Sequence, residues 1–330
     1  MVTLHYPTDP ARARFYQDRN PKIAMLRRAP WHDYSRPSTY LVTIVTKDRH
    51  RCLGKLERNA DGTVHIALSM LGTLILNQQL TTITEHYPMV VVWYVCIMPD
   101  HIHLILRVNA PLPEGKDLGA VIRGFKGGCT VLWRQLTGDA TAQLFADGFN
   151  DKILLREGQL DNWARYLADN PRRLAEKTSH PDWFHALQHQ VVAGRDCQVI
   201  GNRFLLDVPD KRAVIIHRRY TQEERKRLFE EWMRAGRAGA VLVSAGIAKD
   251  EQRVINEAFL RGIAVIKLCQ YGFGPLYKPK GRLFDACREG RYLEVSPWPA
   301  STLKETITRE QCLALNAMAE RLEAESRDRL

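Results

Sequence analysis

The stretch MPDHIHLILRV, residues 98–108, places two histidines one residue apart in a segment rich in branched apolar residues. Successive side chains of a β-strand point to opposite faces, so His101 and His103 project on one face while Ile102 and Leu104 project on the other. Two imidazoles on one face either find hydrogen-bond partners in a half-buried sheet or bind a metal ion. The stretch predicts a strand, and the rest of the chain must separate these two interpretations.

Composition limits the class of protein. The chain has 330 residues, 45% of them hydrophobic, which is enough for a sizeable core, and its length favours two domains. The 48 basic residues outnumber 37 acidic ones, for a net charge of +11, which favours a polyanionic partner, although many mildly basic proteins have none. Seven scattered cysteines without a CxxC pair indicate reduced thiols rather than a zinc ribbon or a disulfide framework.

The amino-terminal segment, residues 1–36, is basic and interrupted by prolines. It predicts an arm laid over a domain or over nucleic acid, or alternatively a solvated leader. The sequence contains no apolar signal core and no apolar run long enough to span a bilayer. We therefore expect a cytoplasmic protein without a membrane partner.

Residues 37–178 predict one α+β domain with antiparallel pairing. Helical spacing of apolar residues runs from Leu71 to Ile83, and two further helices are expected, the second ending at Pro171. The expected strands are 39–47, 63–68, 89–98 and 101–108, and these two helices are 117–136 and 159–171.

Residues 190–300 predict a second, α/β domain, because strands alternate with helices as in crossover units of a parallel sheet. Residues 180–196 are expected to be loop-like, and a carboxy-terminal helix within 301–330 opens with a capping box of Thr308 and Gln311. The expected strands are 213–219, 239–246 and 263–269, and the expected helices are 221–236 and 249–262.

The segment ARYLADNP, residues 164–171, places Tyr166 and Asn170 four residues apart, on one side of a helix. A phenol and an amide oxygen beside two imidazoles would supply a nucleophile and a third metal ligand, as covalent phosphodiester cleavage requires. The alternatives are that Tyr166 is an ordinary boundary tyrosine and that Asn170 only ends the helix before Pro171.

Two motifs in this order, MPDHIHLIL and GFNDKILLREGQLDNWARYLADNPRRLAEK, resemble the single-tyrosine HUH transposases, in particular the group associated with repetitive extragenic palindromes. The resemblance covers about residues 37–178 and implies a ferredoxin-like HUH domain. It implies that His101, His103 and Asn170 bind a divalent cation, Mg²⁺ or Mn²⁺, and that Tyr166 is the nucleophile. It further implies cleavage and rejoining of single-stranded or hairpin DNA through a 5′-phosphotyrosine, in a monomer or a homodimer.

Basic residues outside this set are candidates for DNA contacts, with solvated surface charge as the alternative. In the second domain, basic and aromatic residues interleave over residues 272–298, which suits single-stranded DNA but also a core with a charged rim. The segment VLVSAGIAKDEQRVINEAFLRGIAVIKL weakly resembles the Rossmann-like domain of the DNA-processing protein of natural transformation, and it lacks nucleotide-binding glycine motifs. The candidates are Arg123, Lys126, Lys152, Arg172, Lys278 and Lys280.

Three functions remain open on the sequence. The favoured one is a metal-dependent DNA transposase or strand-transfer nuclease. The others are a domesticated protein that binds hairpin or single-stranded DNA without cutting it, and an unrelated metal-dependent phosphohydrolase acting on small nucleotides. A histidine-triad hydrolase is disfavoured because Ile105 stands where its third histidine belongs.

Overall fold

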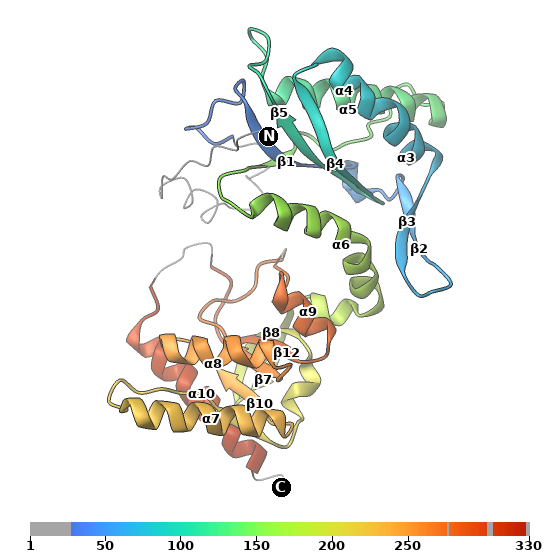
Figure 1. Ribbon diagram of the computed structural model, residues 1–330. Coiled ribbons are helices and arrows are strands. Elements are labelled where there is room, and N and C mark those ends of the chain that lie inside the picture. Colours follow the sequence, from blue (N-terminus) through green and yellow to red (C-terminus); the bar gives the residue numbers. More distant parts are fainter. Residues whose placement is uncertain (1–27, 276, 302–305, 328–330) are drawn as a thin grey trace. The chain divides into compact units, whose positions relative to one another are not determined.

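The computed structural model describes residues 28–275, 277–301 and 306–327 and is drawn in Figure 1. The predicted arm therefore lies, over residues 1–27, outside the described residues. The chain forms two compact units, the first ending at Ala175 and the second beginning at Glu176, and each is described by itself. Among the described residues, no helix combines the length and the apolar character needed to cross a membrane.

The first unit contains a four-stranded antiparallel sheet in the order β4-β5-β1-β6. The chain visits these strands as β1, helices, β4, β5, helix, β6, so that β5, which carries the histidines, is an inner strand. The strands are β1 (Ser38–Val45), β4 (Val90–Met98), β5 (His101–Val108) and β6 (Asn150–Ile153).

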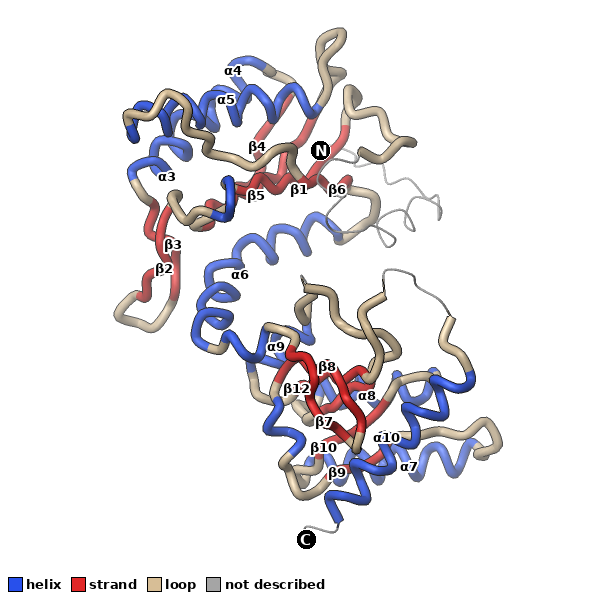
Figure 2. Tube along the Cα trace, turned by 180° about the vertical axis from the view of Figure 1, so that it is seen from behind, coloured by secondary structure: helices blue, strands red, loops and turns tan. Residues whose placement is uncertain are grey.

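One face of this sheet carries the main core of the first unit. Ile102 and Leu104 are fully buried there, which confirms the alternation predicted from the sequence. Helices α3, α4 and α5 cover this face, and α6 lies along the opposite face (Figure 2). The helices are α3 (Met70–Leu74), a π-helical turn (Ile75–Gln79), α4 (Leu80–His86), α5 (Leu118–Thr137) and α6 (Gln159–Ser179).

A separate hairpin of β2 (Gly54–Arg58) and β3 (Val64–Leu68) projects from the first unit. The strand expected at residues 63–68 is confirmed, but its partner β2 was not predicted, because GKLER is short and largely polar. The described end of the amino-terminal segment lies on β6, where Arg28 and Tyr34 both bind the buried carboxylate of Asp151, at 2.7 and 3.0 Å. This part of the segment is thus laid over its own domain.

The prediction that the second helix ends at Pro171 is wrong, because α6 continues through Pro171 to Ser179. Proline lacks the N–H that would bond the carbonyl of Leu167, and a proline here normally ends a helix. Buried residues lie on both sides of it, Leu167 before and Arg173 and Ala175 after, so packing compensates for the missing bond.

The second unit contains a six-stranded sheet in the order β7-β8-β12-β11-β10-β9. Strands β9 to β12 pair in parallel, as the alternation of strands and helices predicts, while β7 and β8 add antiparallel pairs at one edge. The strands are β7 (Leu187–Val192), β8 (Arg195–Gly201), β9 (Lys211–Ala213), β10 (Val241–Ser244), β11 (Val265–Leu268) and β12 (Tyr292–Ser296).

Helices pack on both faces of this sheet. Leu242 and Val265 belong to one core with α7, α8 and α9, whereas Val243 and Ile266 belong to another with α10. Thr308 and Gln311 form the predicted capping box, each side chain accepting a hydrogen bond from the other residue's backbone N–H. The helices are α7 (Gln222–Arg237), α8 (Lys249–Leu260), α9 (Arg282–Arg288) and α10 (Arg309–Arg327).

Two expectations for the second unit are wrong. Residues 180–196, expected to be loop-like, contain β7 and the start of β8, where polar residues such as the exposed Gln188 and His189 hide the strand pattern. The strand expected at 213–219 overlaps the observed β9 (Lys211–Ala213) only at Ala213. The Val214 N–H still donates to the carbonyl of Val243 on β10, but the Ile216 N–H binds the carboxylate of Glu251 instead of a neighbouring strand.

Candidate functional site

The two histidines project from the start of β5 and touch each other edge to face, with ring centroids 4.7 Å apart. In the sheet register His103 lies opposite Thr43 of β1 and opposite Cys96 of β4. Directly opposed residues of antiparallel strands point to the same face, so these three side chains form one row across the sheet.

The ring of His103 is held at one nitrogen and leaves the other without a partner. Its Nδ1 lies 2.8 Å from Thr43 Oγ1, and its buried Nε2 meets no hydrogen-bond partner among the residues that the structure describes. Burial, reinforced by the charges of His101, Lys152 and Arg49, lowers the pKa of His103 to about 3. The imidazole is therefore neutral at physiological pH, and when Nδ1–H donates to Thr43, Nε2 presents a lone pair.

His101 is oriented by the carboxylate of Asp100, which precedes it in the turn. His101 Nδ1 lies 2.6 Å from Asp100 Oδ1, and Arg49 donates to Asp100 Oδ2 at 3.3 Å. Burial alone would raise the pKa of Asp100, but His101 and Arg49 outweigh it and lower that pKa to about 2. When Nδ1–H donates to this ionised carboxylate, Nε2 keeps a lone pair that could bind a metal ion. A carboxylate is a usual hydrogen-bond partner of the second ring nitrogen in a metal-binding histidine.

Tyr166 stands on α6 with its ring over that of His103, at a centroid distance of 5.7 Å. Tyr166 is 42% exposed. Partial burial raises the pKa of its phenol, and the nearby Arg173 offsets part of this increase. The guanidinium carbon of Arg173 lies 6.0 Å from the centre of the Tyr166 ring. A cation over the ring face is an attractive arrangement that fixes the phenol.

Asn170 follows Tyr166 by one helical turn and is 7% exposed. Its Nδ2 is buried without a hydrogen-bond partner in the described part of the chain. The amide lies beside the thiol of Cys96, whose pKa burial raises to about 11 even though Asn170 lowers it. Since Cys96 is opposite His103, Asn170 is close to the row of site residues, as the helical spacing suggests.

The donor set fits a divalent cation only if the amide takes part. Within residues 28–275, 277–301 and 306–327, no three His, Cys, Asp or Glu side chains gather in a metal-binding arrangement. The histidine pair supplies two nitrogen donors, one of them orphaned and buried, and Asn170 supplies a buried amide on α6. Two imidazoles and an amide suit Mn²⁺ and related borderline ions, and also Mg²⁺ with water completing the shell.

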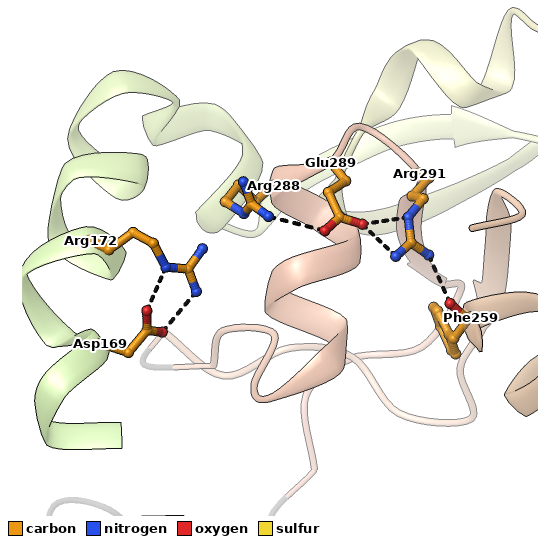
Figure 3. A network of polar contacts seen from close by, with 6 residues as sticks. All are labelled: Asp169, Arg172, Phe259, Arg288, Glu289 and Arg291. Carbon is orange, nitrogen blue, oxygen red and sulfur yellow. Dashed lines mark hydrogen bonds and ion pairs between the residues drawn. The ribbon is translucent and has the colours of Figure 1, made fainter. Parts of the chain in front are cut away.

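The basic residues predicted to bind DNA in the first unit have different environments. Arg123 is exposed on α5 and Lys152 is exposed on β6. Lys126 is half-buried instead of lying on an open helix face, and its Nζ donates to the carbonyls of Ala146 and Gly148 at 2.7 and 2.8 Å. Arg172 donates two hydrogen bonds to the neighbouring Asp169 (Figure 3), which neutralises much of its charge.

In the second unit, most of the aromatic residues that alternate with basic ones are core residues. Phe273, Phe284 and Tyr292 are at most 6% exposed, which favours the core interpretation for them. Tyr277 is partly exposed, but its hydroxyl donates to the buried carboxylate of Glu294. The two lysines in this stretch differ, since Lys280 is exposed and Lys278 is half-buried.

The turn after β10 leads from a strand into a helix, where backbone N–H groups could bind an anion, but these groups are occupied by the protein itself. The carboxylate of Glu251 accepts hydrogen bonds from the backbone N–H groups of Ile216, Ile247 and Ala248. The backbone amides of the turn that would meet an anion are therefore already hydrogen-bonded, which argues against anion binding there.

Elsewhere in the unit, Glu289 binds Arg288 and Arg291, and Arg291 also donates to the carbonyl of Phe259 (Figure 3).

Comparison with known proteins gives distant similarities only. No protein-family model matches the chain, and no curated protein matches it. A REP-associated tyrosine transposase bound to a REP hairpin is 15% identical with a TM-score of 0.32, covering 45% of this chain and 74% of that one. DNA processing protein A from Helicobacter pylori, in a study of its single-stranded DNA binding, is 20% identical with a TM-score of 0.31, covering 42% and 65%. A protein described as a transposase from Deinococcus radiodurans is 15% identical with a TM-score of 0.25, covering 44% and 97%.

Proposed function

We propose that this protein is a metal-dependent, single-tyrosine strand-transfer nuclease that cleaves and rejoins single-stranded or hairpin DNA. The observation that supports this most directly is the arrangement of His103, whose Nδ1 meets Thr43, whose Nε2 is orphaned, and whose ring lies 5.7 Å from that of Tyr166. In this proposal the first unit is a ferredoxin-like HUH domain, and the second, Rossmann-like unit assists DNA binding.

The phenol of Tyr166 is the attacking group. An ordinary tyrosine has a pKa of about 10, so ionising it at pH 7 costs roughly 4 kcal/mol. Burial adds to this cost and Arg173 offsets part of it. When bound by His101, His103 and Asn170, a divalent cation would neutralise charge on the phosphate oxygens.

The chain's own side chains do the positioning. Asp100 and Thr43 fix the two imidazoles, and the helical turn between Tyr166 and Asn170 fixes the phenol relative to the amide. Such preorganisation makes in-line attack at phosphorus effectively unimolecular.

The covalent step balances without a nucleotide cofactor. The Tyr166 oxygen forms a bond to the scissile phosphorus, and its proton passes to solvent. The bond from phosphorus to the 3′-oxygen breaks, and this oxygen takes up a proton and leaves as a 3′-hydroxyl. Attack by another 3′-hydroxyl on the 5′-phosphotyrosine reverses the step and joins strands, because the phosphotyrosine bond conserves the energy of the original linkage.

The test is to incubate the full chain with labelled hairpin and single-stranded DNA libraries in Mg²⁺ or Mn²⁺ and to look for a covalent adduct on denaturing gels. We expect an adduct that requires the cation and disappears in Tyr166→Phe. Tyr94→Phe is the matched control, because Tyr94 is 48% exposed, similar to Tyr166, and should leave the adduct intact.

The alternative functions give different results in the same assay. DNA binding without an adduct in either cation would contradict the proposal and favour a domesticated hairpin-binding protein. Hydrolysis of small nucleotides without preference for DNA and without an adduct would favour a phosphohydrolase.

A further inference from the structure

The short turn after β1 holds two residues in an unusual backbone conformation. Asp48 and Arg49 have φ angles of 54° and 58°, in the left-handed region that L side chains avoid. Hydrogen bonds at the start of the turn hold it in place. The N–H and the hydroxyl of Thr46 both donate to the carbonyl of Asp100, and the Lys47 N–H donates to the carbonyl of Leu144. The surrounding hydrogen bonds hold the backbone in this unfavourable conformation, which suggests that the resulting orientation of a side chain in the turn has a function.

The side chain aimed by this turn is that of Arg49. One guanidinium N–H donates to Asp100 at 3.3 Å, and the side chain remains 62% exposed. A guanidinium has five N–H donors in a planar fork that matches a phosphate, so the contact with Asp100 leaves donors directed to solvent. Arg49 is therefore a cation held at the edge of the histidine pair.

A second cation lies on the other side of the pair. Lys152 of β6 is paired with Leu41 of β1, and Leu41 is paired with Ile105 of β5. Paired residues share a face, so Lys152 lies on the face that carries His103, and it is exposed. His103 therefore lies between the contact of Arg49 with Asp100, the residue before His101, and Lys152 at the level of Ile105.

We propose that Arg49 and Lys152 bind two backbone phosphates of one DNA strand, on opposite sides of His103, so that the strand follows a diagonal path past the histidine pair, beside the part of the sheet that α6 covers. This inference rests on the proposed function, because it assigns the path of that substrate.

The separation between the two proposed phosphate-binding positions can be estimated from the geometry of the sheet. Arg49 is anchored at the level of His101, and Lys152 lies at the level of Ile105, four residues further along and two strands away. With about 4.8 Å between strands and about 3.3 Å per residue, the backbone positions are roughly 16 Å apart. Thr43 lies at the midpoint and His103 is its partner on β5, so a phosphate between the two anchored ones would lie near Tyr166.

The test is the salt dependence of DNA binding, measured by fluorescence anisotropy with a labelled single-stranded oligonucleotide. It is done with chelator present, so that neither cleavage nor the cation contributes. Each phosphate contact to a single strand adds about 0.7 to the slope of log K against log salt. We expect Arg49→Gln and Lys152→Gln each to lower the slope by about 0.7, and the double variant by about 1.4.

Arg134→Gln is the matched control, because Arg134 is an exposed arginine of α5, which covers the opposite face of the sheet, and its slope should equal that of the wild type. Arg49→Lys keeps the charge and should keep the slope, which separates loss of a phosphate contact from collapse of the strained turn. Wild-type slopes in either glutamine variant would overturn the inference, as would a fall in slope in Arg49→Lys equal to that in Arg49→Gln.

The outcome does not depend on catalysis. Lower slopes without any covalent adduct would retain the diagonal path and refute the nuclease. An adduct at Tyr166 with unchanged slopes would retain the nuclease and refute the path.

Discussion

Replacing Thr43 by valine removes the hydroxyl that holds the ring of His103 while keeping a β-branched side chain of similar shape in β1. In the wild type, Thr43 Oγ1 lies 2.8 Å from His103 Nδ1, and His103 is 5% exposed. In the variant both ring nitrogens of a buried imidazole lack partners. Leaving one more buried polar group unsatisfied costs about 1–3 kcal/mol of folding stability.

The same change tests the metal site separately from stability. An outer partner that orients a ligating histidine typically contributes about 10–100-fold to metal affinity. Guanidinium unfolding gives the stability change, and titration of the DNA-free protein with Mn²⁺, followed by the electron paramagnetic resonance signal of the free ion, gives the affinity. Thr43→Ser retains the hydroxyl and should stay close to wild type in both measurements.

One result would refute the reasoning. If Thr43→Val lost the expected stability but bound Mn²⁺ within twofold of the wild type, the contact would serve the fold alone and His103 would not be a ligand.

Three further predictions follow from buried groups. The pKa of His103 is about 3 in the fold against 6.5 for an ordinary histidine, so the unfolded chain binds more protons between these values and stability falls as the pH drops through this window. The loss is at most about 1.4 kcal/mol per pH unit, and urea unfolding of His103→Gln in chelator should show a shallower pH dependence than the wild type. Lys126→Met leaves the carbonyls of Ala146 and Gly148 without their donor, which should lower the calorimetric unfolding temperature, corresponding to about 1–3 kcal/mol; an unchanged temperature would show that water replaces the ammonium. Glu251→Gln weakens a group that accepts from three backbone amides and should destabilise the second unit by a similar amount, measurable by hydrogen exchange of α8.

The features predicted from the sequence are those that depend on local periodicity. Alternation along β5 correctly separates the histidines from Ile102 and Leu104, and helical spacing correctly places Tyr166 and Asn170 on one helix. The parallel pairing of β9 to β12 likewise follows from strands and helices alternating along the chain.

The features that the sequence did not reveal depend on pairing between distant segments. Thr43 meets His103 because β1 and β5 are adjacent in one register, and nothing in the spacing of the two residues specifies that register. Lys126 looks exposed on a helical wheel, yet the loop that contains Ala146 and Gly148 covers it. The contact of His101 with Asp100 differs, because the two residues are neighbours in the sequence and their proximity could have been expected from it.

The apolar contact between α6 and the sheet has a consequence for the chemistry. Leu41 and Ile105 on the strands pack against Trp163 and Leu167 on the helix, and Tyr166 belongs to that same helix. The thickness of this apolar layer therefore sets the distance between the Tyr166 phenol and the two imidazoles. Shortening one of these apolar side chains by a methyl group would therefore change that distance.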